Sequence, residues 1–131
     1  MKNIIFSIIF LLTVSFISCN KPLNNTSSKT IENSKEITFG VRGNCGMCKK
    51  TIEKAANSLE GVSSAVWNMD QKSIVVSYDS INLNVMTIHN AIAASGYDTE
   101  KVLGNVEAYN SLPGCCQYDH DMEMNQTAEQ E

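Results

Sequence analysis

The chain has 131 residues, a formal net charge of −4 at pH 7 and five cysteines. Its ten basic residues form no stripe, which argues against nucleic-acid binding. It has two histidines without a matching acid, and neither a glycine-rich phosphate loop nor a serine elbow, so we expect it not to be an enzyme.

A short basic lead precedes an apolar run over residues 4–17, which has the length of a signal-peptide core and is shorter than the ~20 residues that span a bilayer. The run ends in Phe16-Ile17-Ser18-Cys19, which resembles the lipobox of bacterial lipoproteins, although Phe16 replaces the usual Leu. We expect residues 1–18 to be a lipoprotein signal peptide. Cys19 would carry the lipid and anchor the protein to a membrane of the bacterial cell envelope, facing the periplasm or the exterior. Ordinary cleavage, with Cys19 left as a free thiol, is the alternative.

Residues 19–35 contain Asn, Ser, Thr and Pro without apolar periodicity, which predicts a flexible tether. About seventy residues then remain for an ordered domain, enough for one small fold with a thin core. Residues 36–41 alternate polar and apolar side chains, which predicts a half-buried strand.

Cys45 and Cys48 lie where this strand passes into a helix. The helical pattern is an apolar residue at every third or fourth position: Cys48, Ile52, Ala55, Ala56 and Leu59. Cys45 should lie in the loop before the helix and Cys48 in its first turn, so that both sulfurs converge on one ion and the unpaired N–H groups favour thiolates. Two thiolates suit Cu(I), Hg(II) or, with further ligands, Zn(II) and Cd(II). A redox dithiol has the same spacing, so a thiol-disulfide protein using this pair is the alternative.

The pattern that follows predicts two strands, a helix and a last strand. Residues 62–68 and 73–78 are rich in β-branched and aromatic side chains and flank a turn. An amphipathic helix begins after Asn84 and leaves His89 on its solvated face. Residues 99–106 form the predicted last strand. This order is the βαββαβ arrangement of α+β ferredoxin-like folds, a four-stranded antiparallel sheet with two helices on one face.

With a CxxC at the start of the first helix and a Gly-Tyr at the end of the second, residues 36–106 resemble the heavy-metal-associated domain of copper chaperones, metal-transporting ATPases and periplasmic mercury-scavenging proteins. The resemblance implies that Cys45 and Cys48 are the metal ligands and that Tyr97 lies near the site. It also implies that the partner is a metal-transporting ATPase or another metal-binding protein of the envelope.

One tripeptide departs from the family pattern. The family usually has Gly-Met-Thr or Gly-Met-Ser before the first cysteine, with the Met packed beneath the metal loop, whereas this chain has Arg42-Gly43-Asn44. Met47 lies inside the loop, where its side chain could shield the metal from water. The loop is therefore expected to be looser than in the family.

The segment after Val106 carries six acidic residues and no Lys or Arg. We expect residues 107–131 to form an acidic, largely disordered tail. The tail contains five candidate accessory ligands: Cys115, Cys116, His120, Met122 and Met124. The two thiols could join the ion at Cys45 and Cys48, or form disulfides with that pair in an oxidising compartment.

These features together predict an envelope protein that captures a soft cation and transfers it to a partner by thiolate exchange. Cu(I) is the favoured cation. The thiol-disulfide alternative lacks a candidate cis-proline, because Pro22 and Pro113 lie in the tether and the tail. An interaction module that holds no metal is a third reading, and it predicts that Cys45→Ser and Cys48→Ser leave the activity unchanged.

Overall fold

The computed structural model describes residues 33–124. The predicted signal peptide, Cys19 and most of the tether lie outside these residues. The described chain runs through β1 (Ser34–Gly40), α1 (Gly46–Asn57), β2 (Val62–Asn68), β3 (Ser73–Asp79), α2 (Val85–Ala94), α3 (Val106–Asn110) and the short 3₁₀ helix η1 (Gly114–Cys116). Within residues 33–124, no helix is long and apolar enough to cross a membrane.

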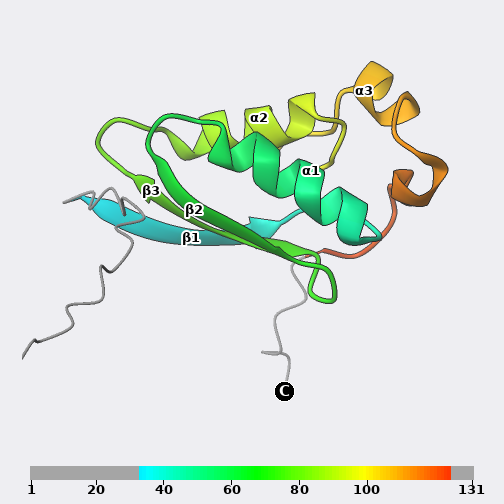
Figure 1. The fold of residues 1–131 in the computed structure, drawn as a ribbon, viewed down its shortest axis with the longest axis horizontal. Helices are drawn as coiled ribbons and strands as arrows, with labels where there is room; N and C mark the ends of the chain where they lie inside the picture. The colour runs from blue at the N-terminus through cyan, green and yellow to red at the C-terminus, as the bar shows by residue number, and fades with distance from the viewer. Residues whose placement is uncertain (1–32, 125–131) are drawn as a thin grey trace, which may run out of the picture.

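The three strands form one antiparallel sheet in the order β1-β3-β2. Figure 1 shows α1 and α2 lying side by side across one face of this sheet. Side chains alternate between the two faces, so that Trp67 and Ile74 are fully buried beneath the helices, whereas Val66 and Val75 are exposed on the other face. The helices complete the core with apolar residues on their inner faces: Cys48, Ile52, Ala56, Ile88 and Ile92. The α+β architecture with a one-sided antiparallel sheet was predicted correctly.

The helix starts agree with the predicted ones. Cys45 is the N-cap residue of α1, and Asn84 caps α2 by accepting a hydrogen bond from the Met86 N–H. Gly61 and Gly96 both have positive φ angles after the two helices, a conformation that glycine adopts without strain.

The predicted fourth strand is not formed among the described residues. A single antiparallel bridge joins Val41 to Thr99, and the chain then turns, because the Thr99 hydroxyl accepts hydrogen bonds from the N–H groups of Lys101 and Val102. Gly104 packs against Gly96 so closely that a Cβ atom there would lie 2.8 Å from the Gly96 carbonyl carbon. This turn replaces a strand pairing along β1, and the chain enters α3 instead.

His89 was predicted to be solvated and is buried. Its ring packs on Phe39 with a centroid separation of 3.9 Å, and its Nδ1 atom lies 2.8 Å from the Thr99 hydroxyl. Burial lowers the pKa of His89 below its ordinary value. The hydroxyl of Thr99 supplies the polar partner that allows a histidine to lie on the buried face of α2.

The chain after α3 folds back onto the domain, so the expected disorder does not hold for residues 107–124. Figure 1 shows α3 beside the end of α2, η1 beside the start of α1, and the following residues running back towards the sheet. We call residues 111–124 the C-terminal segment. Cys116 and Tyr118 in this segment belong to the core cluster, and Tyr109 and Leu112 pack against it. These side chains supply the apolar surface that a disordered tail lacks.

Candidate metal site

The CxxC pair is positioned by the start of α1. Cys45 caps the helix and Cys48 lies in its first turn, which brings the two sulfur atoms to 3.4 Å of each other. The Cys48 sulfur is fully buried and accepts a hydrogen bond from the Asn44 N–H at 3.3 Å, whereas Cys45 is partly exposed. The pair therefore has one inner sulfur, fixed by the protein, and one outer sulfur within reach of solvent.

The outer thiol, Cys45, is more acidic than an ordinary cysteine. Hydrogen bonds, first from the Cys48 N–H and then from the Cys48 thiol and the Met47 N–H, lower the pKa of Cys45 to about 7, although partial burial opposes them. A large share of Cys45 is therefore thiolate at neutral pH, which is the form that binds metal. The ammonium group of the neighbouring Lys49 bonds the Trp67 carbonyl and the Glu53 carboxylate.

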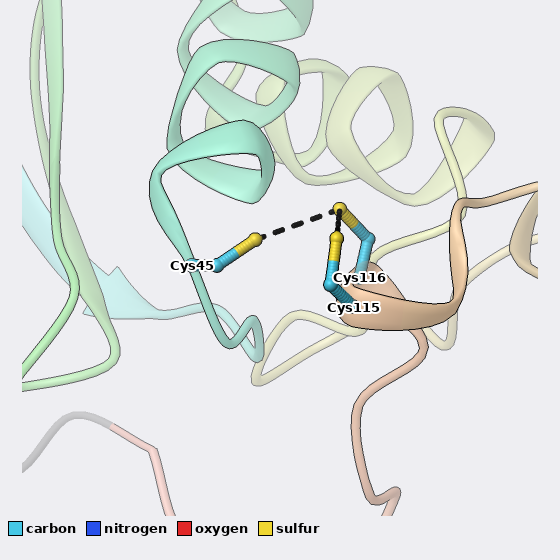
Figure 2. A group of neighbouring side chains, drawn as sticks. All are labelled: Cys45, Cys115 and Cys116. Atoms are coloured by element: carbon cyan, nitrogen blue, oxygen red, sulfur yellow. Dashed lines mark hydrogen bonds between the residues drawn. The ribbon is translucent and has the colours of Figure 1, made fainter.

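Two further thiols reach the same place from the C-terminal segment. The Cys116 sulfur lies 3.7 Å from that of Cys45, and the Cys115 sulfur lies 3.9 Å from that of Cys116 (Figure 2). The four cysteines among residues 33–124 are free thiols in the structure, so of the two possibilities left open for the tail cysteines the disulfide is not formed there. Burial and hydrogen bonds with the Cys48 and Cys45 sulfurs raise the pKa of Cys116 to about 12. Cys115 is exposed and lies 3.9 Å from the Met47 sulfur.

These distances fit a thiolate site. The sulfur atoms of Cys45, Cys115 and Cys116 all lie within 4.8 Å of one another. A tetrahedral ion with metal–sulfur bonds of ~2.3 Å separates its sulfur ligands by roughly 3.8 Å. Soft thiolate donors without a nearby carboxylate ligand select Cu(I), Zn(II) and similar ions over Mg(II) or Ca(II).

A buried carboxylate fastens the C-terminal segment to the domain. Asp98 is fully buried, and its carboxylate accepts hydrogen bonds from the Gly104 N–H at 2.7 Å and from Arg42 at 3.1 Å, with His120 Nδ1 at 2.7 Å. Burial alone would raise the pKa of Asp98, but these partners hold it below its ordinary value. Arg42 also donates from Nε to the Met122 carbonyl at 2.6 Å. Asp98 and Arg42 thus join the loop before the CxxC to the C-terminal segment.

Two tyrosines also hold the C-terminal segment against the domain. The buried Tyr118 hydroxyl accepts from the Asp98 N–H at 2.7 Å and donates to the Gly96 carbonyl at 2.9 Å, while the Tyr109 hydroxyl donates to the Tyr118 carbonyl at 2.6 Å. Burial raises the pKa of Tyr118 well above its ordinary value. Tyr118 lies two residues after Cys116 and therefore fixes where that thiol is held.

Tyr97 lies near the thiols. It is fully buried, and its hydroxyl has no hydrogen-bond partner among the described protein groups. Burial, followed by the thiols of Cys48 and Cys116, raises its pKa above the ordinary value. Its hydroxyl is therefore a buried donor, and two candidate ligand thiols contribute to its raised pKa.

The departure at Arg42-Gly43-Asn44 has two structural explanations. A Cβ atom at Gly43 would lie 3.1 Å from the Trp67 ring, so Trp67 fills the space beneath the loop and leaves little room for a larger residue there. Trp67 is itself fully buried and donates from its indole N–H to the Val41 carbonyl. Arg42 and Asn44 contact the C-terminal segment, the latter through its amide and the Gln117 carbonyl at 3.4 Å.

The remaining predicted ligands are used elsewhere in the described chain. His120 bonds Asp98 and packs on the rings of Tyr109 and Tyr118. The carbonyl of Met122 is engaged by Arg42, and the Met124 side chain covers Gly40 in β1. His120 does not belong to the group of thiols that could hold a metal within residues 33–124. No structural role was predicted for Arg42, Asp98 or Tyr118, although the aromatic residues of the predicted tail indicate packing.

Known proteins are similar to the part of the chain that carries the CxxC pair. Residues 39–98 match the model of the heavy-metal-associated domain, a range that includes the CxxC and ends before the C-terminal segment. The copper chaperone CopZ of Staphylococcus aureus (strain bovine RF122 / ET3-1) is 39% identical over 66 residues, covering 50% of this chain and 96% of that protein. A solved CopZ metallochaperone is 35% identical with a TM-score of 0.48, covering 50% of this chain and 98% of that one. Oxidized MerP from Ralstonia metallidurans CH34 is 29% identical with a TM-score of 0.49, covering 51% and 94%. Because a copper chaperone is 39% identical over nearly its whole length, the chain belongs to the heavy-metal-associated domain family.

Proposed function

We propose that this protein binds Cu(I) through Cys45 and Cys48 and transfers it to a partner in the bacterial cell envelope. The observation that carries the proposal is the convergence of the two sulfurs at 3.4 Å at the start of α1, with the pKa of Cys45 lowered to about 7. The relatives named copper chaperones support copper as the cargo. Hg(II), Zn(II) and Cd(II) are the competing cargoes, since thiolates accept all of them.

The unequal burial of the two thiols suggests how transfer proceeds. Cys48 is fully buried and held by the Asn44 N–H, so it retains the ion, whereas Cys45 is partly exposed and can be replaced. A thiolate of the partner bonds the ion on this open side, and the bond to Cys45 then breaks. The exposed Met47 side chain flanks this entrance. The partner in this proposal is a metal-transporting ATPase or another envelope protein that presents thiolates.

The location rests on the sequence alone. The lipobox-like Phe16-Ile17-Ser18-Cys19 supports a lipid anchor at Cys19, and residues 19–35 would then hold the domain at the membrane surface. Labelling of cells with radioactive palmitate tests the anchor. Label that disappears with Cys19→Ala supports it, and label that is absent from the wild type contradicts it.

The metal proposal is tested by anaerobic Cu(I) titration of the reduced full chain against a competing chelator. Cys45→Ser/Cys48→Ser is expected to abolish tight one-to-one binding. Met86→Leu, which removes a sulfur at the exposed start of α2, is the matched control and should bind as the wild type does. Wild-type protein that fails to compete for Cu(I) would overturn the proposal and favour the thiol-disulfide alternative, which an insulin-reduction assay would then examine.

A further inference from the structure

We propose that Cys116 is a third thiolate ligand of this site, so that the C-terminal segment and the CxxC hold one soft cation between them. This inference rests on the proposed function, because it adds a ligand to the same ion. It concerns a residue outside the range that matches the family model, residues 39–98.

The positions of the sulfurs carry the proposal. The Cys45 sulfur lies 3.4 Å from that of Cys48 and 3.7 Å from that of Cys116, so it stands between the other two thiols. A planar three-coordinate ion with bonds of ~2.3 Å needs sulfur separations of roughly 4.0 Å. The observed separations are shorter by a few tenths of an ångström, so binding requires only a small outward movement of each thiol.

The C-terminal segment holds Cys116 in place before any ion arrives. The Tyr118 hydroxyl bonds the backbone of Gly96 and Asp98, and Arg42 bonds the Met122 carbonyl. These anchors lie two and six residues beyond Cys116. A ligand that is already ordered loses little conformational freedom when it binds, and its contribution to affinity is correspondingly larger.

A buried hydroxyl supplies an independent observation. Tyr97 is fully buried, and its hydroxyl has no partner among the described protein groups, although a buried donor normally has one. After burial, the Cys48 and Cys116 thiols are the groups that raise the pKa of this hydroxyl. Metal binding turns both thiols into thiolates, which accept hydrogen bonds more strongly than thiols do. A cysteine buried only as a small apolar residue would explain the burial of Cys116 but would leave the Tyr97 hydroxyl without an acceptor.

A third ligand changes how the ion leaves. When a partner thiolate forms its bond to the ion, the bond to Cys116 breaks, and the released Cys116 thiolate takes a proton from water. The C-terminal segment therefore retains the cargo until a partner with its own thiolates displaces it.

The test is X-ray absorption spectroscopy and chelator competition on the reduced full chain loaded with one equivalent of Cu(I). The wild type should show three sulfur ligands. Because Cys115 lies beside Cys116 and could replace it, the variant to compare is Cys115→Ser/Cys116→Ser, which should show two sulfur ligands and an affinity lower by about a hundredfold, the gain expected of a tethered extra ligand.

Two single variants separate ligation from packing. Cys116→Val keeps an apolar side chain in the buried position, so near-UV circular dichroism should be preserved while the affinity falls by about tenfold or more. Cys115→Ser removes the exposed thiol and should keep three sulfur ligands. A loss of one sulfur in Cys115→Ser would overturn the proposal, because the exposed thiol would then be the ligand.

The outcomes also separate this inference from the proposed function. Two sulfur ligands in the wild type, with unchanged affinity in Cys115→Ser/Cys116→Ser, would overturn the role of Cys116 and leave Cu(I) binding by the CxxC intact. No Cu(I) binding by the wild type would overturn the proposed function itself.

Discussion

The two halves of the thiol cluster are built in different ways. Cys45 and Cys48 come from one local motif at the start of α1, whereas Cys116 arrives from a position 71 residues further along the chain than Cys45. The first half is partly open to solvent, with the pKa of Cys45 lowered to about 7. In the second half, burial raises the pKa of Cys116 to about 12.

The difference reflects the backbone and side-chain groups around each thiol. Backbone N–H groups at the start of α1 stabilise the Cys45 thiolate. Cys116 has no comparable donors at the short 3₁₀ turn that carries it, and the surrounding apolar atoms favour its neutral form. The C-terminal segment must be docked by other residues for Cys116 to reach the site.

The largest effect is expected from Tyr118→Ala, which removes the main anchor of the C-terminal segment. Loss of this buried ring and its two backbone hydrogen bonds should cost about 3–5 kcal/mol, the range for large aromatic residues in a core. Hydrogen exchange should show residues 111–124 losing protection while α1 keeps its own. Tyr118→Phe, which keeps the ring, is the control and should lose less. Equal protection in wild type and Tyr118→Ala would show that the segment is held by other contacts.

Alkylation by iodoacetamide should distinguish the two halves directly. At pH 7, pKa values of about 7 and about 12 give Cys45 roughly 10⁴–10⁵ times more thiolate than Cys116. The lower nucleophilicity of the more acidic thiolate offsets roughly 10²-fold of this, so Cys45 should react about 10²–10³ times faster. Mass spectrometry of digested protein measures both rates. Comparable rates at the two cysteines in the folded protein would contradict the assigned environments.

Asp98→Asn should weaken the connection between the two halves. The fully buried carboxylate accepts from Arg42 and the Gly104 N–H and pairs with His120, and its loss should lower the free energy of unfolding by about 2 kcal/mol at pH 7. Since the folded pKa of Asp98 is depressed, its contribution is complete above the unfolded value of about 3.9 and is lost as the pH falls through the folded pKa. Urea unfolding across pH 2–7 should therefore show the difference between variant and wild type narrowing in acid. A difference that stays constant down to pH 2 would mean that the carboxylate charge is not what stabilises the fold.

The smallest effect is expected from Asn44→Ala. The Asn44 amide makes an exposed and long hydrogen bond of 3.4 Å to Gln117, and an exposed contact of this kind contributes less than about 0.5 kcal/mol. Thermal unfolding should hardly change, and Cu(I) affinity should stay near that of the wild type, because the backbone N–H of Asn44 that bonds Cys48 is retained. A large loss of affinity would give the amide a role at the site that the structure does not show.

Much of the domain could be predicted from residue patterns. The alternation in β2 and β3, the three- and four-residue apolar spacing in α1 and the Asn cap of α2 are local signals, and each element appears where its signal lies. The fourth strand was predicted over residues 99–106, but the turn at Thr99 and the close packing of Gly104 on Gly96 prevent it. These contacts involve tertiary packing, which residue patterns do not show.

The main wrong prediction was disorder in the C-terminal segment. Its acidic residues and its lack of Lys and Arg indicated disorder, but Tyr118 and Cys116 occupy buried positions against the domain. Of the predicted accessory ligands, His120 bonds Asp98, the Met122 side chain packs against the core, and the Met124 side chain covers Gly40. Composition measures how much apolar surface a segment has and does not show whether a complementary surface exists for it.

The sequence by itself determined the CxxC at the start of a helix, because two cysteines three residues apart and the periodicity that follows are both local properties of the chain. Only the tertiary structure decided that Cys116 joins them. That contact depends on Tyr118, Asp98 and Arg42 closing a separation of 71 residues, and on burial that changes the acidity of the incoming thiol. Local backbone geometry thus sets the first two thiols, and long-range packing sets the third.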